Sequence, residues 1–288
     1  MAYHGRFAPT PSGPLHLGSL LTAVASYLEA RARHGTWRVR VDDIDPPREV
    51  TGAADTILRQ LDQHGLHWDG HVRYQSTRHD AYATAVERLL RDGHAFYCTL
   101  SRRELAQRGG VHPGPSLAVP DPDGSAVRLA VPSAPVTFTD RLQGAQSFAL
   151  HEQEGAFVIR RRDGLYAYQL ACALDDADDG ITDVVRGIDL IDSTPCQLHV
   201  LDCLGRARPR YGHLPVLVDA DGQKLSKSAG AAALGPHAPA NLTQALHRLG
   251  LAPPADLAGA PCPEQLAWAL PHWSLDRLAG QRTCPVMA

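Results

Sequence analysis

The stretch RFAPTPSGPLHLGS, residues 6–19, contains three prolines, two glycines and one histidine between two apolar segments. Directly after it, apolar residues recur at helical spacing, which predicts an amphipathic helix from Ser19 to about Arg33. The strand-like segment WRVRV follows from Trp37. A strand, a Gly/Pro loop, a helix and a second strand in this order form a βαβ unit, which favours a parallel sheet covered by helices.

The remainder of the chain alternates in the same way, with one interruption. Helical periodicity also fits residues 53–66 and 79–92. From residue 98 to about 150, the stretch GGVHPGPSLAVPDPDG and the short runs AVRLAV and VTFTD indicate an insertion of loops and strands. Alternation is expected to resume with FVIRR, and short helical patterns broken by prolines follow residue 236.

The composition is that of a globular protein. The chain has 288 residues, 44% of them hydrophobic, and a formal net charge of -3. No apolar run approaches the roughly 20 residues of a membrane span, and the first residues lack the order of a secretory signal. Six scattered cysteines form no CxxC pair and fit a reducing compartment, so we expect a cytoplasmic protein.

The proline-rich corner has the features of a phosphate site. A strand that enters a glycine-containing loop and then a helix brings unpaired backbone N–H groups and the positive end of the helix dipole together. Gly13 and Gly18 would let a nucleotide approach the backbone, and His16 would lie over its phosphate. The alternative is a tight loop whose histidine only packs or caps.

A second polar stretch, DGQKLSKSAG, follows an apolar strand about two hundred residues later. Its Lys224 and Lys227 lie among small polar residues, as in a mobile loop that brings ammonium groups to a polyphosphate. A lysine pair in a loop is more often plain surface. The two stretches together, in this order, favour a nucleotide site.

HLGS at residues 16–19 and KLSKS at residues 224–228 resemble the HIGH and KMSKS signatures of the class I aminoacyl-tRNA synthetases. The stretches VDDIDPPR, AYQLA, VVRGIDL and STPCQLHVLDCLG are similar to the glutamyl branch of this family. The DIDPPRE stretch and the motif spacing most closely resemble short paralogues of glutamyl-tRNA synthetase that lack its anticodon-binding domain. The resemblance extends from residue 5 to about residue 275.

The resemblance implies an α/β fold of four parts: a Rossmann-type doubly wound parallel sheet, split by a mixed insertion and followed by a small, mainly helical C-terminal region. Residues 1–96 would form the first half of the sheet with the HIGH-type motif. Residues 97–150 would form the insertion, in the position of an acceptor-binding region. Residues 151–235 would form the second half with the KMSKS-type motif, and residues 236–288 the helical end.

Members of this family convert glutamate and ATP into glutamyl-adenylate and pyrophosphate, and then transfer the acyl group. Because a carboxylate attacks the α-phosphate in line, the enzyme mainly positions the reactants and neutralises phosphate charge. The resemblance implies that His16, Lys224 and Lys227 are catalytic and that Mg²⁺ accompanies ATP by bridging its phosphate oxygens. The implied ATP-binding residues are Gly13, His16, Gly18, Ser19, Lys224, Ser226 and Lys227.

The glutamate pocket is also implied by the resemblance. Arg6 would pair with the side-chain carboxylate, and Asp42 would hold the ammonium group, where the family commonly has the longer glutamate. Tyr168 and Arg186 match further substrate contacts. Each could instead be structural, with Arg186 bridging to the carboxylates of DDADDG. The implied glutamate-binding residues are Arg6, Ala8, Pro9, Thr10, Asp42, Tyr168 and Arg186.

Many relatives in this family carry a zinc site in the insertion. The corresponding positions here are Cys98, Leu100, His112 and Ser116, of which only the first and third have side chains that commonly ligate zinc. A structural zinc normally takes four ligands. We therefore expect no zinc, and a metal analysis that finds one bound equivalent would contradict this.

The acceptor is implied by the length of the resemblance. Glutamyl-tRNA synthetases continue into an anticodon-reading helical domain, whereas this chain ends at Ala288. The short paralogues transfer glutamate to the queuosine base in the anticodon loop of tRNA(Asp), which a compact protein can recognise in a splayed, single-stranded loop. Arginines at 160–162 and 206–210 are candidate phosphate contacts.

Two alternatives stay open. One is a minimal glutamyl-tRNA synthetase that charges a tRNA 3′ end, or another adenylate-forming glutamyl transferase. The other is an inactive synthetase-like module that binds tRNA or a protein. The presence of His16, Lys224 and Lys227 argues against the module, because pure binding has no need of nucleotide loops.

Overall fold

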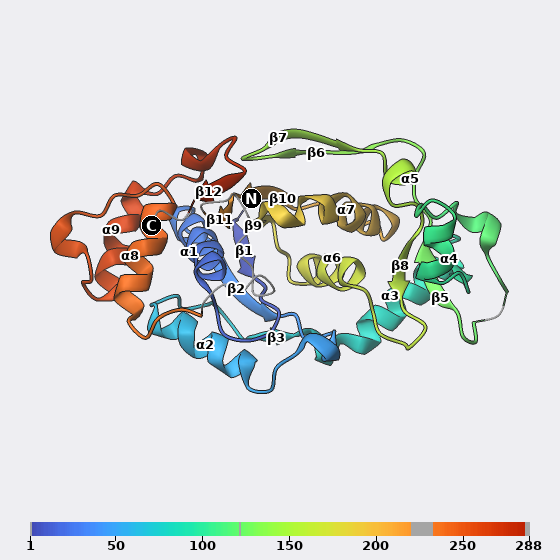
Figure 1. Ribbon diagram of the computed structural model, residues 1–288, viewed down its shortest axis with the longest axis horizontal. Helices are drawn as coiled ribbons and strands as arrows, with labels where there is room; N and C mark the ends of the chain where they lie inside the picture. The colour runs from blue at the N-terminus through green and yellow to red at the C-terminus, as the bar shows by residue number, and fades with distance from the viewer. Residues whose placement is uncertain (1, 121, 220–232, 286–288) are drawn as a thin grey trace.

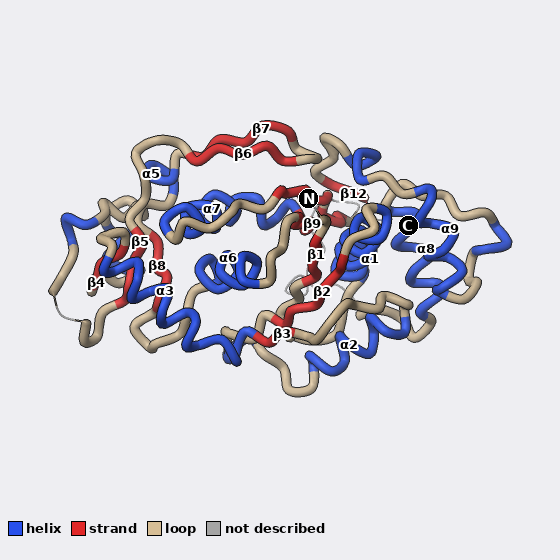
Figure 2. The backbone as a smooth tube through the Cα atoms, turned by 180° about the vertical axis from the view of Figure 1, so that it is seen from behind, coloured by secondary structure: helices blue, strands red, loops and turns tan. Residues whose placement is uncertain are grey.

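The computed structural model describes residues 2–120, 122–219 and 233–285. The molecule is elongated, with the C-terminal helices at one end and the small sheet of the insertion at the other (Figure 1). The parallel strands lie between these two ends, as the view from behind also shows (Figure 2). Within the part of the chain that the structure describes, no helix is both long and apolar enough to cross a membrane.

The first half of the chain forms the predicted βαβ unit. Strand β1 (His4–Phe7) leads into helix α1 (Leu17–Ala32), which returns to β2 (Thr36–Val41). The two strands pair in parallel, so the predicted unit is confirmed. The turn into β2 requires Gly35, because a Cβ at that position would lie 2.3 Å from the carbonyl oxygen of Tyr3.

Strand β1 lies in the middle of a larger parallel arrangement. On one side, β2 pairs with β3 (Arg73–Tyr74). On the other, β9 (Asp183–Gly187) pairs in parallel with β10 (Arg210–Leu214), and the Thr182 amide donates to the His4 carbonyl at 2.9 Å. The order β3-β2-β1-β9-β10 is that of a doubly wound fold, so the predicted fold class is confirmed.

A separate antiparallel sheet forms the far end of the insertion. Its strands are, in order, β4 (Ala95–Cys98), β5 (Ala126–Leu129) and β8 (Phe157–Arg160). The stretch FVIRR was expected to resume the parallel alternation within the predicted second half, residues 151–235. Instead it pairs with β5 of the insertion. The pattern of apolar residues in a strand reflects which face is buried and does not name the partner strand, so this pairing could not be predicted.

The predicted strand VTFTD belongs to both parts of the molecule. It is β6 (Val136–Asp140), which forms an antiparallel hairpin with β7 (Gly144–Phe148). The end of β6 also pairs with β10, where Asp140 lies opposite Tyr211. One segment of the predicted insertion, residues 97–150, thus brings a carboxylate to the edge of the parallel sheet.

The C-terminal region packs on α1 through α8 (Ala238–Arg248) and α9 (Cys262–His272), which share one apolar core with it. The apolar strand expected before the lysine motif, GHLPVLVD at residues 212–219, is divided at Pro215, which has no backbone N–H, into β10 and β11 (Val216–Val218). The late strand β12 (Thr283–Pro285) pairs in parallel with β11. The other helices are α2 (Ala53–Gln63), α3 (His79–Arg91), α4 (Arg102–Gln107), α5 (Leu150–Gln153), α6 (Tyr168–Asp178) and α7 (Thr194–Cys203).

Candidate functional site

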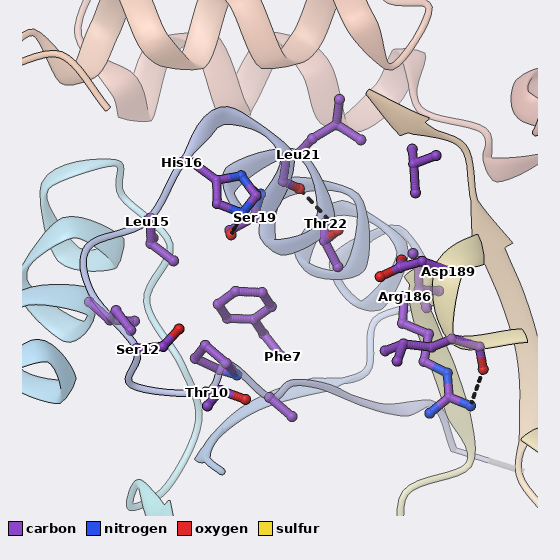
Figure 3. Close-up of a pocket in the computed structure, with 18 of the residues that line it drawn as sticks. Phe7, Thr10, Ser12, Leu15, His16, Ser19, Leu21, Thr22, Arg186 and Asp189 are labelled. Carbon is purple, nitrogen blue, oxygen red and sulfur yellow. Dashed lines mark hydrogen bonds between the residues drawn. The ribbon is translucent and has the colours of Figure 1, made fainter. Parts of the chain in front are cut away.

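A cavity of about 710 Å³ lies at the carboxyl ends of β1 and β9. In doubly wound sheets, ligands bind at this edge, where the strand order reverses. Figure 3 shows His16 and Ser19 on the α1 side of the cavity and Arg186 with Asp189 on the β9 side. Its polar lining includes Arg6, Thr10, Ser12, His16, Ser19, Thr22, Arg48, Tyr168, Arg186 and Asp189.

His16 caps the amino end of α1. Its Nδ1 accepts a hydrogen bond from the backbone N–H of Ser19 at 3.2 Å, and its Nε2 lies 3.0 Å from the Ser19 hydroxyl oxygen. Because Nδ1 is an acceptor, the neutral ring carries its proton on Nε2. The cap explains why α1 begins two residues before the predicted Ser19, and it holds the imidazole beside the Ser19 hydroxyl in the cavity lining.

The amino end of α1 favours an anion. The helix runs for 16 residues, and its first turn carries no acidic side chain. The positive end of its dipole therefore faces the cavity uncompensated by a local carboxylate. A Cβ at Gly18 would lie 3.1 Å from Cε1 of His16, so glycine leaves the imidazole room at this position. This geometry matches the phosphate site predicted for the corner.

The lysine motif, with Lys224, Ser226 and Lys227, lies outside the described residues. The chain on either side of it is described and meets the same corner. Before it, Val216 and Leu217 of β11 line the cavity. After it, the Leu234 amide donates to the Leu15 carbonyl at 3.0 Å, next to a β-bridge between Ala233 and His16. Both flanks of the motif therefore lie beside the HIGH-type motif.

Arg6 belongs to a buried ion cluster of two arginines and two aspartates. Its Nε and Nη2 each lie 3.1 Å from a carboxylate oxygen of Asp176, and Arg40 lies 2.5 Å from Asp176 and 2.6 Å from Asp42. Burial opposes ionisation, yet Arg6 and Arg40 together lower the pKa of Asp176 to about 2. Burial raises the pKa of Asp42, although its contact with Arg40 works in the opposite direction. In their ionised forms, the charges of the two arginines and two aspartates sum to zero.

Arg186, on the neighbouring strand β9, has a different environment. Its Nε lies 3.2 Å from Nε2 of His213, and its two Nη atoms donate to Gln197, Thr194 and the Leu190 carbonyl. The guanidinium carbon lies 5.2 Å from the centre of the Tyr211 ring. Each of these partners is uncharged, although Arg186 is only 3% exposed.

The cavity brings together most of the predicted glutamate-binding residues. Ala8, Pro9, Thr10 and Tyr168 line it along with the two arginines. Burial raises the pKa of Tyr168, so its hydroxyl stays protonated and can donate a hydrogen bond. Asp42 is not among the lining residues that the structure describes, and its carboxylate accepts from Arg40.

Three important residues escaped the sequence analysis: Arg40, Asp176 and His213. Asp176 lies in DDADDG, whose carboxylates were considered as partners of Arg186, but it pairs with Arg6 instead. One signal was present in the sequence. Asp176 follows Leu170, Ala173 and Leu174 at helical spacing, which indicates a carboxylate on a buried helix face that requires a cation. Gly13, also predicted, has φ of 130° and shapes the loop outside the cavity lining.

The positions that correspond to a zinc site form a compact pair. Sγ of Cys98 lies 3.3 Å from Nε2 of His112, and both side chains are buried. Leu100 and Ser116 supply no comparable ligand. Across the described ranges, no cluster of three or more His, Cys, Asp or Glu side chains could hold a metal ion. The donor set present does not fit a four-coordinate zinc.

The arginines considered for phosphate contact are mostly paired with aspartates. Arg161 contacts Asp163, and three arginines after α7 each contact a different aspartate. These three pairs are Arg206 with Asp178, Arg208 with Asp202, and Arg210 with Asp183. Their charge is therefore partly compensated within the chain, which weakens their attraction for a phosphate backbone.

Comparisons with known proteins identify the family and the fold. Residues 3–112 and 120–253 match the family described as tRNA synthetases class I (E and Q), catalytic domain. The fold is shared with the glutamate-tRNA synthetase of Elizabethkingia anophelis, at 23% identity and a TM-score of 0.83 over 100% of this chain and 68% of that one. The fold and the matched family define the chain as a class I synthetase catalytic domain.

Relatives with higher sequence identity specify the branch of this family. A Pseudomonas aeruginosa protein named glutamyl-Q tRNA(Asp) synthetase is 52% identical over 99% of this chain and 98% of its own length. A Pseudomonas putida protein of the same name is 50% identical over 99% of this chain and 95% of its own. The chain belongs to the family of the glutamyl-Q tRNA(Asp) synthetases.

Proposed function

We propose that this chain activates L-glutamate with ATP in the absence of tRNA and transfers the glutamyl group to the queuosine base in the anticodon loop of tRNA(Asp). One observation carries the proposal: a single cavity joins the capped amino end of α1 to a wall with Arg6, Tyr168 and Arg186. The names of relatives matched over nearly their whole length support the acceptor.

The arginine wall suits an amino acid with a second carboxylate. Arg186 presents a guanidinium whose partners are neutral, and the Tyr168 hydroxyl can donate beside it. Arg6, with Ala8, Pro9 and Thr10, lines the same wall. We propose that these residues bind glutamate. Because Asp42 is bonded to Arg40, its predicted contact with the substrate ammonium would require a bridging water or a shift of its side chain.

The α1 side suits the phosphates of ATP. The helix dipole favours an anion there, and the Ser19 hydroxyl, which can accept from Nε2–H of His16, keeps its own proton to donate. We propose that Lys224, Ser226 and Lys227 contribute from the motif whose flanks meet this corner. Mg²⁺ would arrive with ATP and would neutralise part of the phosphate charge.

The reaction needs no covalent enzyme intermediate. An oxygen of the glutamate carboxylate forms a bond to the α-phosphorus, and the bond from that phosphorus to the bridging oxygen breaks, so pyrophosphate leaves with the electron pair. His16 and Lys227 would stabilise the charge that develops on the phosphate oxygens. In the second step the acyl group passes to the queuosine base and AMP leaves.

The test has two stages. Glutamate-dependent ATP–pyrophosphate exchange is measured without tRNA, and labelled glutamate is then followed onto queuosine-containing and queuosine-free tRNA(Asp). The proposal predicts exchange without tRNA and label only on queuosine-containing tRNA. Stable label on queuosine-free tRNA would instead favour 3′-end charging by a minimal synthetase. No exchange under any condition would favour the inactive tRNA-binding module.

A Lys227→Ala variant tests the nucleotide side. We expect exchange to fall at least a hundredfold, since one charge-stabilising donor commonly contributes about 10²–10³ in rate, while the melting temperature stays unchanged. Unchanged exchange would contradict the role of Lys227. We propose the cytoplasm as the site of the reaction, where the free thiols of all six cysteines would stay reduced.

A further inference from the structure

His213 lies behind Arg186 and is fully buried, between β9 and the end of β6. Its Nδ1 lies 2.5 Å from a carboxylate oxygen of Asp140, and its Nε2 lies 3.2 Å from Nε of Arg186. Asp140, His213 and Arg186 thus form a continuous line of hydrogen bonds that ends at the cavity wall. Neither Asp140 nor His213 belongs to the sequence motifs that predicted the site.

Nε2 of His213 has two polar neighbours, Nε of Arg186 at 3.2 Å and the Thr194 hydroxyl oxygen at 3.1 Å, and the contact with Arg186 decides its protonation. Nε of Arg186 can only donate, so Nε2 of His213 must accept. The neutral imidazole therefore carries its proton on Nδ1 and donates it to Asp140. Burial lowers the pKa of His213, and its contact with Asp140 only partly offsets this, so the ring is neutral.

Asp140 is itself held firmly. Its second carboxylate oxygen accepts the backbone N–H groups of Leu142 and Gln143, both at 2.9 Å, and of His213 at 3.2 Å. These bonds, together with His213, outweigh burial and lower the pKa of Asp140. The imidazole of His213 lies between the Asp140 carboxylate and Arg186. The guanidinium is therefore oriented without forming an ion pair with Asp140.

We propose that His213, fixed by Asp140, is the positioning residue for Arg186. It holds the guanidinium at the cavity wall as a cation whose hydrogen-bond partners are neutral, so that the site takes a ligand that brings its own carboxylate. The assignment of that ligand as glutamate rests on the proposed function. The orientation of Arg186 by His213 stands on the geometry alone.

A matched pair of substitutions tests the proposal. In His213→Gln, the longer amide can present its oxygen where Nε2 lies and accept from Arg186. In His213→Asn, the shorter amide can reach Asp140 but leaves Nε of Arg186 without this acceptor. We expect His213→Asn to raise the KM for glutamate at least tenfold, with kcat and the KM for ATP within about twofold, and His213→Gln to recover most of the loss.

Several results would overturn the proposal. These are an unchanged KM for glutamate in His213→Asn, equal rises in KM for glutamate and for ATP, or a folded His213→Gln variant as impaired as His213→Asn. A structural role of His213 would predict the last result, because both variants would then lose the same packing.

A second measurement needs neither activity nor a variant. ¹⁵N NMR of the imidazole in the wild-type protein should show a proton on Nδ1 and a bare Nε2 for His213. The opposite tautomer would overturn the proposal even if both variants failed to fold. If wild-type protein shows this tautomer but no glutamate-dependent exchange, the proposed function fails and the orientation of Arg186 by His213 remains.

Discussion

Arg6 and Arg186 line the same cavity from the neighbouring strands β1 and β9, yet their charges are compensated differently. Arg6 makes a two-point contact with the Asp176 carboxylate inside a buried ion cluster. Arg186 is surrounded by an imidazole, an amide, a hydroxyl and a carbonyl. Since a carboxylate ligand competes poorly for a guanidinium that already has one, we propose that Arg186 makes the stronger contact with glutamate and that Arg6 also holds the ion cluster together.

The largest effect should follow from breaking the Arg6 side. Asp176→Asn removes one carboxylate from the buried ion cluster and leaves Arg6 and Arg40 with only Asp42. An uncompensated buried charge is costly, so we expect the free energy of unfolding to fall by about 3–5 kcal/mol in urea denaturation. Asp163→Asn, at an exposed pair with Arg161, is the control and should cost less than about 1 kcal/mol. Equal losses would contradict the comparison.

A smaller effect, on substrate binding and not on folding, should follow from substituting Arg186. Arg186→Lys keeps the charge but loses the planar fork that contacts several neutral acceptors. We expect the KM for glutamate in pyrophosphate exchange to rise about tenfold or more, equivalent to at least about 1.4 kcal/mol, with little change in the KM for ATP. The comparison breaks down if this variant unfolds as readily as Asp176→Asn.

The smallest effect concerns Cys98 and His112, a buried pair in the insertion that contains no carboxylate. Burial lowers the pKa of His112 to about 4, assisted by Arg128, and the Gly114 amide already donates to its Nδ1. The folded ring thus stays neutral where an unfolded histidine, with a pKa near 6.5, takes up a proton. Stability is full above pH 6.5 and falls as the pH drops toward 4.

We expect a loss of about 1 kcal/mol between pH 7.5 and pH 5.5, measured by urea denaturation at each pH. The His112→Gln variant, which has no titrating group at this position, should show a flatter dependence on pH over this range. An identical slope in both proteins would show that His112 does not titrate as inferred. The other histidines provide the shared background in this subtraction.

The local features of the site could be predicted from the sequence. The strand, corner and helix around His16 depend on neighbouring residues, and helical spacing located α1, α2 and α3. The wall residues from Arg6 to Thr10 belong to the same quoted stretch. These predictions succeeded because backbone geometry, capping and the helix dipole act over a few residues.

The long-range partners could not be predicted in this way. Arg6 and Asp176 are 170 positions apart, and Asp140 meets His213 across 73. The spacing of apolar residues does not indicate which of the several aspartates in α6 will pair with which arginine. The pairing of β8 with β5 has the same origin, since a strand pattern specifies a buried face and leaves the neighbour open.

The pairing of β12 with β11 makes the far end of the described chain a support for the cavity. Val216 and Leu217 line the cavity from β11, and Thr283 to Pro285 form the parallel strand beside them. A protein engineer who deleted this strand or fused a bulky partner directly to it would remove backbone hydrogen bonds from the cavity wall itself. Substrate affinity, and not only solubility or yield, is therefore the property to monitor when this end is altered.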